Sequence, residues 1–203
     1  MNILALDTST TTCLVALLTP NQHHFLHETG FKQQGRLILP LIEKCLNLGN
    51  LGLHDLNGLA YCHGPGSFTG IRIANSVVQG ISFAKKIPIV PLSSLQIKAQ
   101  AAFLCEQKNS ILVAINAEME QIYWANYELS ADGIMQLKGQ ENCGQKGDIP
   151  KDSLEKNYSF AVLARSLVTL AAYHFKTRRG MNAEEVSPLY LRGPNVKNKV
   201  EIL

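Results

Sequence analysis

Short apolar runs separated by polar turns open the chain. Residues 2–7 (NILALD) and 13–20 (CLVALLTP) are two such runs, and the hydroxyl-rich turn TSTTT lies between them. A third run over residues 23–28 mixes apolar and polar positions. Because strands joined by turn residues have this pattern, we predict a β-hairpin followed by a third strand.

The period of the apolar positions changes after the third run. Apolar residues recur every three or four positions from Leu37 to Leu48, which predicts a helix over residues 36–48 that ends at Gly49. The pattern then predicts, in order, a strand at 57–62, a helix at about 69–85, a strand at 87–92 and a helix at about 93–105.

The same order begins again in the second half of the chain. Three strands are predicted at 111–116, 121–129 and 133–139, followed by a polar loop at 139–157, a helix at 159–175 and an extended piece at 187–194. Three strands followed by helix, strand and helix, repeated in a shortened second copy, indicate a duplicated α/β fold. The predicted division is a first subdomain at 1–105, a reduced second subdomain at 106–193 and a tail at 194–203.

The first long helix is apolar around more of its circumference than a core requires. Its apolar positions, from Leu37 to Leu48, cover roughly 200°, whereas a helix that lies on a core needs an apolar stripe of about 100° or a little more. Two explanations remain open. The excess is buried inside a small fold, or it forms an interface with a partner chain.

The helix predicted at 69–85 also has two contact faces. One is an apolar stripe suited to a sheet, formed by Ile71, Ala74, Val78 and Ile81. The other is a ridge of small residues spaced four apart, where a second helix could approach closely. The predicted partner interface comprises Leu37, Leu41 and Cys45 on the first helix, and Arg72 at the rim with Ile73, Ser76, Val77, Gly80 and Ala84 on the second.

The glycine-rich loop GPGSFTG does not match the phosphate-binding or nucleophile motifs. Gly70 is followed by Ile71 instead of Lys and Ser or Thr, and Pro65 stands where a nucleophile elbow around Ser67 needs glycine. Anion binding at the amino terminus of the next helix remains an alternative. We favour a structural role, in which Gly64, Gly66 and Gly70 shape the loop and allow tight packing.

Asp7, Thr8 and Ser9 stand at the end of the first strand. A carboxylate beside hydroxyls could organise a metal ion and phosphate oxygens, which would make these residues a vestigial phosphate loop. Asp at a strand end also simply favours a turn. No catalytic pair of carboxylates is indicated, and the cluster of His23, His24 and His27 has no carboxylate placed with it, so no metal site is predicted.

Composition and charge exclude several classes of protein. The chain has 203 residues and a net charge of +3, from 19 basic and 16 acidic residues, which is too small to imply nucleic-acid binding by itself. Five cysteines with no Cys-x-x-Cys pair favour a reducing compartment. No apolar run approaches the ~20 residues of a membrane span, and the first residues do not resemble a signal peptide. We therefore expect a cytoplasmic protein that does not enter a membrane.

Several segments together resemble the TsaB (YeaZ) family. They are NILALDTST, LAYCHGPGSFTGIRIA, VPLSSLQ, QIYWANY and PLYLR, of which the block at 63–73 is the most specific. The resemblance implies an actin-like, Hsp70-like (ribonuclease H-like) duplicated fold. It also implies a non-catalytic subunit that supports a catalytic TsaD-type paralogue in forming threonylcarbamoyladenosine at position 37 of tRNAs that read codons beginning with A.

The resemblance further implies partners and cofactors. The two helices discussed above would form a helical bundle with the TsaD-type subunit, or a homodimer without it. A TsaE-type ATPase would complete the complex, which uses ATP and contacts tRNA. No cofactor is expected to bind tightly to this chain alone.

Some positions depart from the family pattern. Gln34 and Gly35 replace a His followed by Ser or Thr, and residues 116–118 read Asn-Ala-Glu in place of Asp-Ala-Arg. The metal-binding His-x-x-x-His motif of the catalytic paralogue has no counterpart here, since the one pair with that spacing, His23 and His27, falls in a predicted strand. Two rival functions remain: an independent actin-fold ATPase or small-molecule kinase, which would need Asp7 to hold magnesium nucleotide, and a peptidase.

Overall fold

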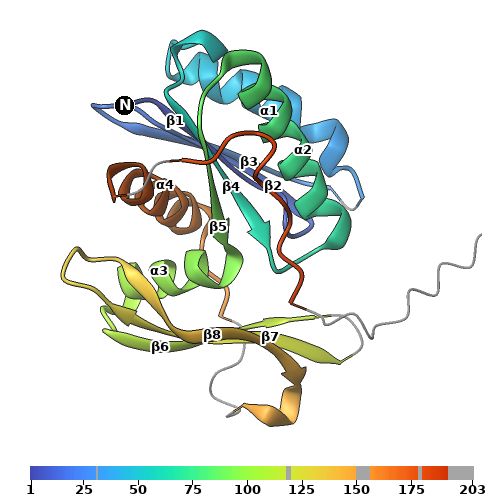
Figure 1. Ribbon diagram of the computed structural model, residues 1–203, viewed down its shortest axis with the longest axis vertical. Coiled ribbons are helices and arrows are strands. Elements are labelled where there is room, and N and C mark those ends of the chain that lie inside the picture. Colours follow the sequence, from blue (N-terminus) through green and yellow to red (C-terminus); the bar gives the residue numbers. More distant parts are fainter. Residues whose placement is uncertain (31, 118–119, 150–155, 178–179, 192–203) are drawn as a thin grey trace, which may run out of the picture.

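A five-stranded mixed sheet forms the centre of the larger lobe (Figure 1). The computed structural model describes residues 1–30, 32–117, 120–149, 156–177 and 180–191. The strands are β1 (Ile3–Asp7), β2 (Thr12–Leu18), β3 (His23–Thr29), β4 (Gly58–Gly64) and β5 (Ile89–Ser93), in the order β3-β2-β1-β4-β5. β1 pairs antiparallel with β2 and parallel with β4, so the carboxyl ends of β1, β4 and β5 lie at the same edge.

Helices cover both faces of this sheet. α1 (Gln34–Leu48) and α2 (Phe68–Lys85) bury their apolar stripes on one face, where Ile38 and Val78 pack with Leu4 and Leu6. α4 (Phe160–Thr177) covers the other face with Ala164, Leu167, Val168 and Ala171. Burial on both sides explains why β1 reads as a continuous apolar run instead of an alternating one.

A second sheet forms the smaller lobe. Its strands β6 (Ser110–Asn116), β7 (Gln121–Leu129) and β8 (Met135–Gln145) are antiparallel neighbours. α3 (Ser94–Glu106) packs on this sheet through Leu95 and Ala99 and also contacts α4, so it links the two lobes. Two single-turn 3₁₀ helices, η1 (Leu53–Asp55) and η2 (Lys146–Asp148), complete the described elements.

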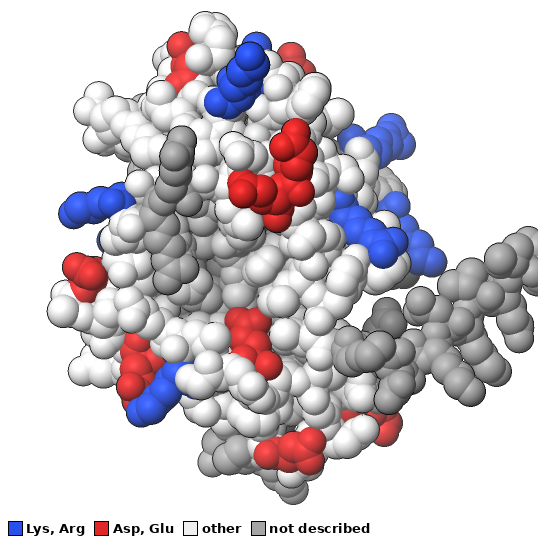
Figure 2. Space-filling view, viewed as in Figure 1, with Lys and Arg blue, Asp and Glu red and all other residues white. Residues whose placement is uncertain are grey.

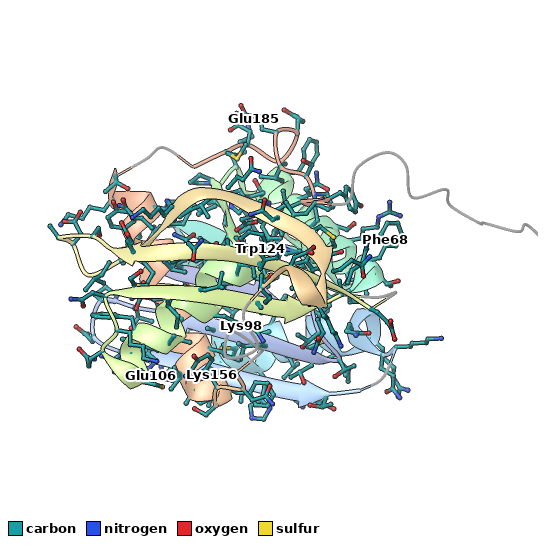
Figure 3. All side chains as sticks on the ribbon, turned by 90° about the horizontal axis from the view of Figure 1, so that it is seen from below. Phe68, Lys98, Glu106, Trp124, Lys156 and Glu185 are labelled. Carbon is teal, nitrogen blue, oxygen red and sulfur yellow. The ribbon has the colours of Figure 1, made fainter. Side chains whose placement is uncertain are left out.

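An ion pair ties the end of α3 to the segment before α4. Lys156 Nζ donates to the Glu106 carboxylate at 2.7 and 2.9 Å, and the two side chains lie side by side in Figure 3. Lys108 contacts the same carboxylate at 2.9 Å. The hydrogen bonds from Lys156 and Lys108 lower the pKa of Glu106 to about 2.

The predicted elements are confirmed with one exception. Residues 139–145 were expected in a polar loop, but they extend β8 to Gln145. Cross-strand pairing to β7 overrides their low strand propensity, since Cys143 pairs with Tyr123 and Asn142 with Trp124. Three predicted stretches lie outside the described residues: 150–155 of the loop, 192–194 of the extended piece, and the tail at 194–203. The division at residues 105 and 106 stays a prediction, although α4, from the second range, packs on the sheet of the first.

Residues 180–191 form a carboxyl-terminal strap that runs back over the first sheet. Met181 makes an isolated antiparallel bridge with Ile89, and Leu189 N donates to His63 O at 2.8 Å. Gln79 Nε2 donates to Ala183 O at 2.9 Å. The strap therefore crosses β4, β5 and α2. Among the described residues, every helix is too short or too polar to cross a membrane.

Candidate docking surface

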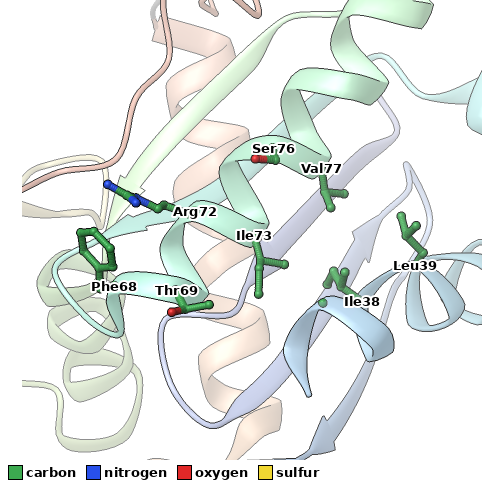
Figure 4. Close-up of a pocket in the computed structure, with 9 residues that line it drawn as sticks. Ile38, Leu39, Phe68, Thr69, Arg72, Ile73, Ser76 and Val77 are labelled. Carbon is green, nitrogen blue, oxygen red and sulfur yellow. The ribbon is translucent and has the colours of Figure 1, made fainter. Parts of the chain in front are cut away.

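An apolar groove lies between α1 and α2 on the outer surface of the larger lobe. It has a volume of about 400 Å³. In Figure 4, Ile73 and Val77 of α2 point toward Ile38 and Leu39 of α1, while Arg72 extends over Phe68. The groove is lined by Gly35, Ile38, Leu39, Phe68, Thr69, Arg72, Ile73, Ser76 and Val77.

The ends of both helices are fixed by local hydrogen bonds. Ser67 Oγ caps α2 by accepting from Gly70 N at 3.3 Å. Gln34 is buried at the start of α1, and its Nε2 donates to Thr10 O at 2.9 Å. A Cβ on Gly35 would lie 3.7 Å from Ile73 Cδ1, so a small residue there leaves room for the groove.

The two helices carry half of the large exposed apolar side chains in the described chain. Eight such residues exist, of which Leu39, Leu48, Phe68 and Phe83 lie on α1 or α2, with exposures of 58, 50, 56 and 75%. Scattered apolar residues are common on protein surfaces, but a cluster beside an apolar groove indicates an interaction site. The surplus apolar surface predicted from the sequence is therefore present on these helices.

Two residues of the predicted interface belong to the core instead. Leu41 is 3% exposed and Cys45 is fully buried, and both pack against β2 and its neighbours. Burial raises the pKa of the Cys45 thiol to about 11, and its Sγ contacts Val15 O at 3.9 Å. Neither side chain can reach a partner, so their assignment to the interface was wrong.

The other predicted interface residues divide into two groups. Leu37, Ile73 and Val77 are half-buried against the core, with part of each side chain accessible. Arg72, Ser76, Gly80 and Ala84 are exposed, and a Cβ on Gly80 would meet no atom within 4 Å. The predicted ridge on α2 is thus accessible, although its contact with a partner stays a prediction.

Helical periodicity does not single out the most exposed apolar residues. Phe83 and Phe68 stand beside the ridge of α2, and Leu39 stands one residue from the buried Ile38. A signal was present, because aromatic residues outside the apolar stripe of an amphipathic helix are unusual unless they are covered. On α1 the strongest periodic stripe contains Leu37, Leu41 and Cys45, and that stripe is the one turned to the sheet.

The two helices carry more basic than acidic residues, and Arg72 is the charged residue that lines the groove. α1 carries Arg36 and Lys44 against a single acidic residue, Glu43, and α2 carries Arg72 and Lys85 with no acidic residue. Figure 2 shows Lys and Arg side chains at the right edge of the upper half, beside the amino-terminal ends of the two helices. A partner with acidic side chains around an apolar contact would complement this surface.

The glycines of the loop before α2 serve close backbone packing. Gly64 has φ +118°, a conformation that other residues rarely adopt. A Cβ on Gly66 would lie 2.7 Å from Ser9 O, and one on Gly70 would lie 1.9 Å from Thr8 O. The loop is therefore pressed against the turn after β1, as the structural interpretation of the glycines predicted.

The polar groups of Asp7, Thr8 and Ser9 bond within the fold. Asp7 Oδ1 accepts from Ser9 N at 2.8 Å, and Thr8 Oγ1 donates to Gly70 O at 2.7 Å. Ser9 O accepts from Ser67 N at 2.8 Å. Thr8 and Ser9 are buried under the glycine loop. This arrangement fits a turn better than a phosphate loop, which needs free N–H groups that face an open site.

Titratable groups near this turn are held in their neutral forms. Burial, together with the nearby Asp7 carboxylate, raises the pKa of the Cys62 thiol well above its usual value. Burial lowers the pKa of His63 to about 4, partly opposed by a hydrogen bond with the backbone of Ser187. Within the described ranges, no group of three or more His, Cys, Asp or Glu side chains could hold a metal ion.

Comparisons with known proteins give consistent matches. A family model described as "TsaD: tRNA N6-adenosine threonylcarbamoyltransferase" matches residues 28–197. The chain is 30% identical over 219 residues to the tRNA threonylcarbamoyladenosine biosynthesis protein TsaB of Escherichia coli (strain K12), with 95% of each chain covered. It is 39% identical over 125 residues to the protein of the same name from Haemophilus influenzae, covering 62% of this chain and 53% of that protein.

A solved structure is similar over nearly the whole chain. YeaZ from Pseudomonas aeruginosa has a TM-score of 0.84 and 30% sequence identity, and the match covers 94% of this chain and 99% of that one. The predicted fold class, a duplicated actin-like α/β fold, is thereby confirmed. The Haemophilus match spans about half the length of that relative, whereas the Escherichia match spans nearly all of its relative.

Proposed function

The chain belongs to the TsaB family of tRNA threonylcarbamoyladenosine biosynthesis proteins, and from this we propose that it is a non-catalytic subunit that docks a TsaD-type catalytic subunit. The docking surface is formed by α1 and α2. The catalytic subunit would carry the transfer chemistry at position 37 of the tRNA, while this chain holds it in a productive conformation.

One observation carries the proposal: the exposed apolar side chains gather on two neighbouring helices with an apolar groove between them. Leu39 and Phe68 line the groove itself, and Phe83 is the most exposed of the large apolar residues. Covering this surface would remove apolar area from water, which is the main favourable term in protein association. Without the catalytic subunit, a second copy of the chain would cover it.

The internal hydrogen bonds of the turn after β1 support a non-catalytic role. Asp7 and Thr8 would have to face a magnesium nucleotide in an actin-fold ATPase, but their side chains bond to Ser9 and Gly70. In the proposed complex, a TsaE-type subunit hydrolyses ATP, and tRNA is bound by the assembly. The rival ATPase function therefore has less support than docking.

Co-expression of this chain with a TsaD-type subunit tests the proposal. We expect the two proteins to co-purify and to elute together on size exclusion as a complex of defined stoichiometry. Leu39→Asp should abolish co-purification, because it places a charge in the apolar groove. Leu137→Asp is the matched control, since Leu137 is 44% exposed on β8 and lies outside the groove.

Three results would count against the proposal. The first is separate elution of the wild-type chains over a micromolar range of concentrations. The second is co-purification of Leu39→Asp as efficiently as the wild-type protein. An equal loss with Leu39→Asp and Leu137→Asp would also count against this placement of the surface.

A further inference from the structure

Three side chains form a cluster at the end of the groove where α2 begins. The guanidinium carbon of Arg72 lies 3.7 Å from the ring centroid of Phe68. Arg72 Nε donates to Tyr190 Oη at 2.9 Å, and the rings of Phe68 and Tyr190 are 5.8 Å apart. The guanidinium is thus held by a cation–π contact and a hydrogen bond, although Arg72 is exposed.

Tyr190 reaches this position because the carboxyl-terminal strap is fixed. The preceding residue, Leu189, donates from its backbone N to His63 O at 2.8 Å. Three residues before Tyr190, Ser187 O accepts from the buried Tyr61 hydroxyl at 3.2 Å. The strap therefore sets where the Tyr190 hydroxyl lies, and through it the direction of the Arg72 side chain.

The cluster leaves one edge of the guanidinium available. Arg72 donates from Nε to Tyr190, and its Nη1 and Nη2 groups, which form a fork of donors, make no hydrogen bond to another described residue. In the part of the chain that the structure describes, no carboxylate forms an ion pair with Arg72. An exposed arginine that is already oriented loses little conformational entropy when it binds a carboxylate.

We infer that Arg72 is a prearranged anchor for a carboxylate of the docked subunit, and that Tyr190 is the residue that positions it. This inference rests on the proposed function and names the chemistry of the partner: an apolar helical face that carries an Asp or Glu side chain at one end.

Charge complementarity supports this occupant over a second copy of the chain. α1 and α2 together carry Arg36, Lys44, Arg72 and Lys85 against Glu43. A second copy would bring the same groove, which is lined by Arg72 and by no Asp or Glu, so it offers Arg72 no carboxylate from this face. The apolar groove beside Arg72 favours a protein over a free anion, because a free anion would leave Leu39 and Phe68 uncovered.

Calorimetric binding of the full chain to a purified TsaD-type subunit tests the inference. Arg72→Gln should raise the dissociation constant by about tenfold and reduce its dependence on salt, since a charge-assisted hydrogen bond is lost. Arg72→Lys should not restore binding, because a lysine offers no fork. Arg165→Gln is the matched control: it removes an exposed arginine from α4, on the opposite face of the sheet.

A double-mutant cycle tests the role of Tyr190. Tyr190→Phe keeps the ring but removes the hydroxyl, so we expect the dissociation constant to rise by about threefold in the wild-type background. In the Arg72→Gln background the same change should have no effect, because the residue that it positions is gone. An equal loss in both backgrounds would show a structural role only and would overturn this part of the inference.

Further outcomes separate this inference from the proposed function. If the wild-type chain does not bind the TsaD-type subunit, the proposed function fails. If the wild-type chain binds and Leu39→Asp does not, but Arg72→Gln binds like the wild type, only the inference fails. A loss with Arg72→Gln that appears only when magnesium ATP or tRNA is added would assign a phosphate to Arg72, and it would also overturn the inference.

Discussion

The carbonyl oxygen of Thr8 occupies the space that a side chain on Gly70 would need. A Cβ at Gly70 would lie 1.9 Å from that oxygen, and the Thr8 hydroxyl donates to the Gly70 carbonyl at 2.7 Å. The first turn of α2 is therefore pressed against the turn after β1. This contact also fixes the start of α2, and with it one wall of the docking groove.

Gly70→Ala should destabilise the protein strongly. The methyl group would collide with backbone, which cannot move without separating α2 from β1, so we expect the free energy of unfolding to fall by at least about 3 kcal/mol. Urea unfolding followed by circular dichroism measures the change. Gly80→Ala is the matched control on the same helix: it has open space around it and should raise stability by about 1 kcal/mol. A mild effect at Gly70 would contradict the packing described.

Truncation of Leu41 should destabilise the protein far more than truncation of Leu39, because Leu41 faces the core and Leu39 faces solvent on the same helix. Leu41 is 3% exposed, so its truncation should lower the free energy of unfolding by about 2 to 5 kcal/mol. Leu39 is 58% exposed, and its truncation should change stability by less than about 0.5 kcal/mol. Chemical denaturation of both variants provides the comparison. Equal losses would show that the two faces of α1 are not distinguished as described.

Gly80→Leu should weaken the complex while the isolated chain stays folded. The position is exposed and unobstructed in the free protein, but a leucine there would stand on the ridge where a partner helix approaches. We expect the dissociation constant for the TsaD-type subunit to rise about tenfold, or roughly 1.4 kcal/mol. Thermal melting checks the fold and calorimetry checks binding; unchanged affinity would place the interface elsewhere on the surface.

His63 should make stability fall in mild acid. Burial lowers its pKa to about 4 in the folded protein, below the ordinary value of 6.5. Between these values the unfolded chain binds a proton that the folded chain does not. The contribution of His63 to the free energy of unfolding is therefore fully present above pH 6.5 and is lost as the pH falls toward 4. Because of this group, the free energy of unfolding falls by up to about 1.4 kcal/mol for each pH unit in that range.

His63→Gln should remove that component of the pH dependence. Urea unfolding at several pH values between 4 and 7 compares the variant with the wild type. His54→Gln replaces a histidine whose side chain is 78% exposed and should leave the wild-type slope in place. Parallel curves for the wild type and His63→Gln would show that His63 does not couple to folding.

The isolated chain should not bind magnesium ATP tightly. The Asp7 carboxylate and the Thr8 hydroxyl bond to Ser9 and Gly70, so binding a nucleotide there would require those contacts to break. Isothermal titration of the chain alone with ATP and magnesium should give no saturable heat up to nucleotide concentrations of about 0.1 mM. A dissociation constant of that size corresponds to a binding free energy of roughly 5.5 kcal/mol. Stoichiometric binding would support the rival ATPase function.

The order of elements was predictable because hydrophobic period and turn chemistry decide it locally. The shift to helical spacing near Leu37 located α1, and the helical spacing that follows the glycine-rich loop located α2. The end of β8 was not predictable in this way. Residues 139–145 have low strand propensity, and the pairing of residues 142–145 with β7 extends the strand through them.

The candidate site was predictable as a pair of helices but not residue by residue. Periodicity shows that a helix has an apolar stripe, but it does not show which stripe faces the sheet. Periodicity therefore assigns Leu41 and Cys45 to the interface although they face the core, and it does not select the exposed Phe83. The cluster of Arg72 with Tyr190 joins residues 118 positions apart in the sequence, so only the folded chain could reveal it.

The placement of α4 has a consequence for how the chain is made. One face of the first sheet stays open to water until Ala164, Leu167 and Val168 arrive to close it, and these residues follow the whole second sheet. A nascent chain that has left the ribosome only as far as α3 therefore exposes an apolar face of the first sheet. Such a surface binds chaperones or aggregates. The amino-terminal half has to wait for the rest of its own polypeptide before its core is complete.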